Sequence, residues 1–120
     1  MEQIIKDFGK LLGMQNLYVP PGKFFRLNME NLGDLDLLHE EERLLMRLTK
    51  SVPFFSKESL LNLFTATHYR NFSSQPPMRP WLQKPDRVGL GIIFSEREAT
   101  SNQLYQALEL LTKELGKVCT

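Results

Sequence analysis

The chain has 120 residues, the length of a single domain, and its 42% hydrophobic and 24% charged residues are ordinary for a globular protein. Its formal net charge is +1, from 15 Lys and Arg against 14 Asp and Glu, so the strong basic excess typical of nucleic-acid binders is missing. The single cysteine, Cys119, excludes an internal disulfide.

The first predicted element is a short amphipathic helix over residues 2–12. Its apolar residues recur at helical spacing with charged residues between them: Ile4, Ile5, Phe8, Leu11 and Leu12. The charges argue against a secretory signal, and no stretch approaches the ~20 apolar residues of a membrane span. We therefore expect a soluble, cytoplasmic protein.

Three short strands follow, each with apolar residues at every second position. They lie around Phe25–Met29, Leu35–Leu37 and Leu44–Thr49. Turn signals at Asn31–Gly33 and Glu40–Glu42 separate them. Connections this short favour an antiparallel meander.

The second half of the chain alternates between helix and strand. Ser56 is a good N-cap for a helix that runs to about Tyr69. Residues 72–86 are rich in proline and predict a mobile loop, with a short edge strand at Trp81–Gln83. A strand at Val88–Phe94 and a helix that runs to Val118, with Thr100 or Ser101 as its N-cap, close the chain. The apolar residues of this helix repeat at steps of four and three and are expected to pack against the sheet: Leu104, Leu108, Leu111, Leu115 and Val118.

One face of the strand at Val88–Phe94 carries Gly89 and Gly91 in place of bulky side chains. Glycine weakens a strand unless something approaches closely there, so we expect a helix or a partner chain over that face. The whole chain is predicted to be one α+β domain, residues 1–120, with the order α-β-β-β-α-β-β-α. Its antiparallel, twisted sheet has helices packed on it in two layers.

No group of residues in the sequence has the spacing of a catalytic or metal site. We interpret His39 as part of a solvated turn and His68 as a helix-face histidine, because neither is paired with a nucleophile or a set of ligands. Asp34 and Asp36 share one strand face, but alternation alone produces that pattern, and we assign them to the solvent face. The sequence therefore predicts no enzyme, no metal and no cofactor.

Two aromatic positions leave alternatives open. Phe24 and Phe25 are adjacent and must point to opposite faces of their strand. If Phe25 lies in the core, Phe24 lies either under a covering helix or on a binding surface. Trp81 is either a core residue or an interface anchor.

Three segments of the chain resemble the class I chaperones of bacterial type III secretion, and most closely their SycN branch. Phe25–Met29 through Gly33–Leu37 is similar to the first hairpin of that family, and Glu41–Leu48 to its third strand. Arg87–Phe94, followed by Leu104–Leu111, resembles the closing strand and helix.

The resemblance implies a dimer that binds the extended N-terminal segment of one secreted protein and keeps it secretion-competent without ATP. The implied dimer partner is either a second copy of this chain or, as in the SycN branch, a second small chaperone. In that branch the implied client is a gatekeeper of secretion. The alternative is an assembly subunit of the secretion apparatus that binds no client.

A client segment can bind at a strand edge and place side chains in neighbouring apolar grooves. The predicted client-binding residues, from the first helix and the outer face of the first strand, are Phe8, Leu11, Leu12 and Phe24. The predicted dimer interface consists of residues of the second helix: Leu60, Leu61, Leu63 and Phe64.

Overall fold

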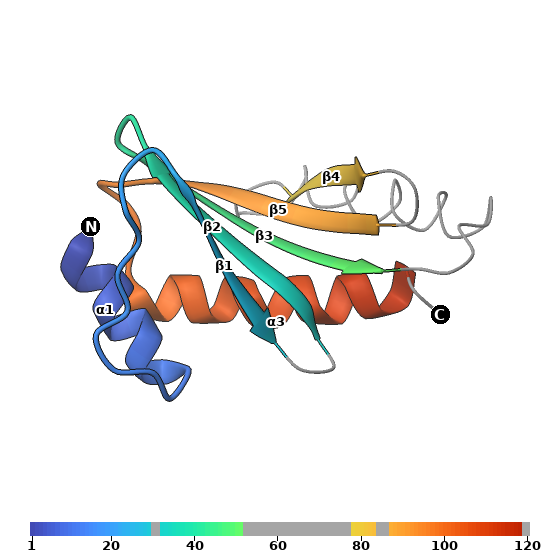
Figure 1. Ribbon diagram of the computed structural model, residues 1–120, viewed down its shortest axis with the longest axis horizontal. Coiled ribbons are helices and arrows are strands. Elements are labelled where there is room, and N and C mark those ends of the chain that lie inside the picture. Colours follow the sequence, from blue (N-terminus) through green and yellow to red (C-terminus); the bar gives the residue numbers. More distant parts are fainter. Residues whose placement is uncertain (30–31, 52–77, 84–86, 119–120) are drawn as a thin grey trace.

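A five-stranded antiparallel sheet with helices on one of its faces forms the framework of the protein (Figure 1). The computed structural model describes residues 1–29, 32–51, 78–83 and 87–118. The described elements in chain order are α1 (Glu2–Leu11), β1 (Phe24–Met29), β2 (Gly33–Glu40), β3 (Arg43–Ser51), β4 (Met78–Gln83), β5 (Arg87–Ser95) and α3 (Ser101–Val118). The predicted helix at Ser56–Tyr69 lies outside the described residues.

The strands follow the order β1-β2-β3-β5-β4, and every neighbouring pair is antiparallel. The first three strands therefore form the predicted meander. The predicted α+β fold is confirmed.

The turn between β2 and β3 is built from two glutamates. Glu40 pairs with Arg43, so only Glu41 and Glu42 connect the strands. Their φ angles are +50° and +62°, and positive φ at both central residues is the type I′ pattern of tight hairpins. Glutamate rarely adopts this conformation, which favours Asn and Gly.

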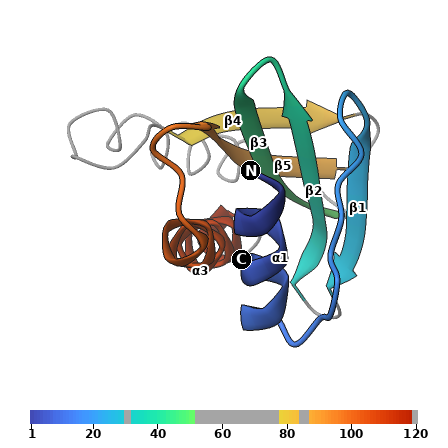
Figure 2. The ribbon, with the colours of Figure 1, turned by 90° about the vertical axis from the view of Figure 1, so that its left-hand side faces the viewer.

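The hydrophobic core lies between the helices and the inner face of the sheet. This face is formed by alternate residues of the central strands, all buried: Leu35, Leu37, Leu44, Met46, Leu48, Leu90, Ile92 and Phe94. The stripe of α3 that covers them is the predicted one as far as Leu115, and Leu104, Leu108, Leu111 and Leu115 are all buried. Figure 2 shows α1 beside α3 on the same side of the sheet.

The start of α3 is set by a reciprocal capping box. The backbone N–H of Gln103 donates to Oγ1 of Thr100, and the backbone N–H of Thr100 donates to Oε1 of Gln103, each over 3.2 Å. Two N–H groups that lack a helical acceptor are thereby satisfied. Thr100, one of the two predicted caps, is the residue that begins this helix.

The edge strand β4 is longer than predicted, because it begins at Met78 rather than at Trp81. Met78 pairs with Ile92, is buried on the inner face of the sheet and extends the core. Pro80 is exposed in the middle of the strand. It is tolerated there because an edge strand forms ladder bonds on one side only.

Candidate protein-binding surface

The outer edge of β1 is open in the described part of the chain. β1 is the end strand of the sheet and pairs with β2 alone. An edge strand presents a row of backbone N–H and C=O groups that lack ladder partners. Such an edge can accept an extended peptide as an additional strand.

The two faces of β1 differ in chemistry. Phe25, Leu27 and Met29 are half-buried and pack against the hydrophobic core. Phe24 and Arg26 lie on the opposite face and are exposed, Phe24 to 51%. A strand added at this edge would therefore meet apolar side chains on one face, and one aromatic and one cationic side chain on the other.

The first helix contributes less surface than predicted. Leu11 is 46% exposed and Leu12 is half-buried, so both remain candidates for client contact. Phe8 is fully buried, and its assignment to a client-binding surface is wrong. The buried face of α1 is formed by Ile5, Phe8 and Gly9, and Leu11 lies outside it.

The segment between α1 and β1 packs tightly on the helix. A Cβ atom placed on Gly9 would stand 2.6 Å from Cβ of Leu17, so only glycine permits this approach. Leu17 and Val19 are buried as a result. The backbone N–H of Gly22 then donates to the carbonyl oxygen of His39 over 2.8 Å and fixes the entry into β1.

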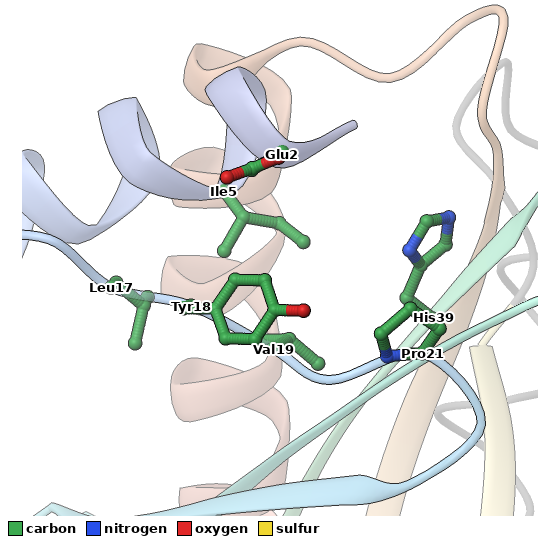
Figure 3. Close-up of a pocket in the computed structure, with 7 residues that line it drawn as sticks. All are labelled: Glu2, Ile5, Leu17, Tyr18, Val19, Pro21 and His39. Atoms are coloured by element: carbon green, nitrogen blue, oxygen red, sulfur yellow. The ribbon is translucent and has the colours of Figure 1, made fainter.

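A small pocket opens between α1, this segment and β2 (Figure 3). Its apolar lining comes from Ile5, Leu17 and Val19. The remaining lining residues are Glu2, Tyr18, Pro21 and His39. Apolar walls with a few polar groups suit an apolar side chain of a partner.

His39 belongs to β2 rather than to a solvated turn, which corrects the interpretation from sequence. It pairs with Leu44 across the ladder, and its side chain is half-buried. Its Nε2 atom lies 3.8 Å from Oε2 of Glu96, whose other oxygen lies 3.7 Å from the N-terminal amine. His68 and Cys119 lie outside the described residues.

The outer face of the sheet holds a buried carboxylate between two arginines. Asp36 is only 1% exposed, so its assignment to the solvent face is wrong. Arg26 donates to its two oxygens from Nε and Nη2 over 2.7 and 3.0 Å. Arg47 donates to Oδ2 from Nε and Nη2 over 3.1 and 2.8 Å.

These hydrogen bonds set the protonation of the cluster. Burial raises the pKa of Asp36, but the hydrogen bonds and charges of Arg26 and Arg47 outweigh it, and the net pKa is lowered. The hydrogen bond to Asp36 likewise raises the pKa of Arg26. Asp36 and Arg26 are therefore both charged at neutral pH.

A second carboxylate continues the cluster toward β5. Nη2 of Arg87 donates to Oδ2 of Asp34 over 2.7 Å and to Oγ1 of Thr49 over 2.8 Å. Nη1 of Arg26 lies 3.9 Å from the same Asp34 oxygen. The cluster thus extends across β1, β2, β3 and β5.

Aromatic rings flank the cluster on the same face. The guanidinium of Arg47 lies 4.6 Å from the ring centroid of Phe24 and 5.8 Å from that of Trp81, both within cation–π range. Trp81 covers Gly91, where an added Cβ would stand 2.5 Å from its Cζ3. The close approach expected at the glycines is therefore confirmed, but in the described part of the chain it comes from Trp81 and Thr49 rather than from a helix or partner.

Sequence reasoning missed the arginines of this cluster. In the ladder, Arg26 pairs with Asp36 and Asp36 with Arg47, so the three stand in one row. Aligning the predicted strands through their turns would have placed them side by side. Among the described residues, no group of three or more His, Cys, Asp or Glu side chains could hold a metal ion, and no helix is long and apolar enough to cross a membrane.

Comparisons with known proteins give matches at the level of structure. The sequence matches no family model and no curated protein. The Yersinia pestis type III secretion chaperone SycH, solved in complex with a fragment of YscM2, matches with a TM-score of 0.76 and 15% identity over 98% of both chains. The HopA1–SchA chaperone–effector complex matches with a TM-score of 0.73 and 15% identity, over 96% of this chain and 89% of that chain.

The chain has the fold of the class I type III secretion chaperones. The same fold also occurs, at a TM-score of 0.56 and 14% identity over 99% of this chain and 88% of the other, in YbjN of E. coli. A fold shared this widely does not assign a function, so the function must be argued from the surface.

Proposed function

We propose that the chain is a non-enzymatic type III secretion chaperone. It binds an extended N-terminal segment of a secreted protein in the cytoplasm and keeps that protein secretion-competent. The client segment adds a strand at the outer edge of β1 and contacts accessible apolar residues nearby: the exposed Leu11 and Phe24 and the half-buried Leu12.

The observation that carries this proposal is the combination of an open strand edge with exposed apolar side chains, in a chain with the chaperone fold over nearly its whole length. Backbone hydrogen bonds at an edge provide affinity without demanding one sequence, and neighbouring side chains provide selectivity. A client that must stay unfolded can be held in this way, because an extended segment needs no folded partner surface.

The finer features rest on the resemblance to the SycN branch. We propose that the client is a gatekeeper of secretion and that the chain acts as a heterodimer with a second small chaperone. The residues proposed for that interface, Leu60, Leu61, Leu63 and Phe64, lie outside the described residues.

The proposal is tested by expressing the tagged protein in its native host and measuring both co-purification and secretion. One large secreted protein should co-purify, and deletion of the chaperone gene should lower secretion of that protein alone. The double variant Leu11→Glu/Phe24→Glu should reduce the amount of co-purified client at least several-fold, because it places two charges on the apolar contact surface.

Gln106→Glu is the matched control, since it adds negative charge at an exposed position of α3. It should leave client capture unchanged. Capture of a membrane-ring component in place of a secreted protein would contradict the chaperone function and support an assembly subunit.

A further inference from the structure

The charged cluster on the outer face of the sheet is not balanced. Three guanidinium groups, from Arg26, Arg47 and Arg87, meet two carboxylates, from Asp34 and Asp36. Each of the two carboxylates already forms ion pairs with two arginines. Among the described residues, the cluster is therefore one negative charge short.

The excess positive charge reaches solvent at the edge of β1. The side chain of Arg47 is 10% exposed and lies between the rings of Phe24 and Trp81. The side chain of Arg26, on the end strand, is 49% exposed. The Nη1 atom of Arg26 lies 3.9 Å from Oδ2 of Asp34, which is too far for a hydrogen bond. An incoming group can thus reach Arg26 without displacing the buried pairs.

We propose that the strand accepted by β1 carries an acidic side chain opposite Arg26. This inference rests on the proposed function and specifies the chemistry of the client segment. The alternate positions of that strand are apolar, because they face Phe25, Leu27 and Met29 on the inner face. The client segment is therefore an alternating apolar–acidic strand.

Directly opposed side chains on neighbouring strands lie close enough to interact. A carboxylate opposite Arg26 would bring the cluster to three negative charges against three positive. A lysine at the same position would add a fourth cation to an already positive site and would be disfavoured. The overall charge of +1 does not reveal this preference, because it arises from the local arrangement of five side chains.

The test uses two labelled synthetic peptides of about nine residues, within the ordinary length of a strand. Both alternate leucine or valine with serine, and they differ only in having Glu or Lys at the central polar position. Their affinity for the full-length protein is measured by fluorescence anisotropy. At about 0.01 M salt the Glu peptide should bind about fivefold tighter, and at about 1 M salt the two should bind alike.

Three variants connect the preference to one residue. Arg26→Gln should abolish it, because the cluster then holds two charges of each sign, whereas Arg26→Lys should retain it. Arg79→Gln is the matched control, since Arg79 is an exposed arginine on the same face at the opposite edge of the sheet, and it should behave like wild type. Thermal unfolding of each variant establishes that it is folded.

Equal affinity for the two peptides at low salt, preference for the Lys peptide, or binding of neither would overturn the inference. A preference that survives in Arg26→Gln would overturn it as well. These outcomes are distinguishable from failure of the proposed function, which is judged by co-purification and secretion of the natural client.

Discussion

At the scale of single residues, Asp36 connects burial, charge and stability. A carboxylate that is 1% exposed loses its hydration, and it is stable only because Arg26 and Arg47 surround it with hydrogen bonds. Removing its charge would leave the largely buried Arg47 without its ionic partner. The cost of breaking such a buried pair is large.

We expect Asp36→Asn to lower the free energy of unfolding at neutral pH by on the order of 3 kcal/mol. The pKa of Asp36 is lowered in the folded protein. The stabilisation that the charged Asp36 side chain contributes is therefore complete above its unfolded-state pKa of about 3.9, and it is lost as pH falls through the lower folded-state pKa. The difference between wild type and variant, measured by urea unfolding, should shrink below about pH 4.

Glu109→Gln, at an exposed position of α3, serves as the control and should change stability little at any pH. A difference between wild type and Asp36→Asn that stays constant from neutral to acidic pH would contradict the role assigned to the carboxylate.

The same residue shows how far sequence reasoning reaches. Alternation correctly places Asp34 and Asp36 on one face of β2. It does not reveal burial, because burial depends on the ladder register that brings Arg26 and Arg47 alongside. The prediction that Phe8 contacts a client was wrong for a related reason. Helical spacing identifies an apolar stripe, but the packing of α3 and Leu17 against the helix decides which residues of that stripe remain exposed.

At the scale of elements, strong local signals predicted the structure well. The period of two identified β1, β2, β3 and β5, and the cap at Thr100 began α3 as expected. The edge strand β4 was only partly predicted, because two of its residues precede Pro80 in a proline-rich stretch. Pairing with β5 outweighs the weak strand signal there.

The hairpin between β2 and β3 predicts an element-scale effect. Glu41 and Glu42 occupy a type I′ turn with positive φ, at a conformational cost that Asn and Gly avoid. Glu41→Asn/Glu42→Gly should therefore raise the free energy of unfolding by about 1 kcal/mol, measured by urea unfolding.

The control for that variant is Glu41→Gln/Glu42→Gln, which removes the same charges and keeps the unfavourable backbone. If this control stabilises the protein equally, repulsion between the glutamates and not backbone strain limits the stability of the turn.

At the scale of the whole molecule, client and partner are proposed to use different surfaces. The proposed client surface lies at β1, one end of the strand order, and β4 forms the other end. The proposed subunit interface belongs to the second predicted helix, which lies outside the described residues. If the two surfaces are separate, a substitution at one should leave the other function intact.

Leu61→Asp should therefore dissociate the dimer, because assembly would bury an unpaired charge at a cost of several kcal/mol. Sedimentation velocity on the chain co-expressed with the second small chaperone should show the wild type as a heterodimer and the variant as a monomer. Leu11→Asp introduces the same charge at an exposed position of α1 and should remain dimeric.

The Leu61→Asp monomer should still prefer the Glu peptide. A dimer that persists in Leu61→Asp would move the subunit interface elsewhere, and loss of peptide binding on dissociation would mean that β1 and the interface form one continuous site.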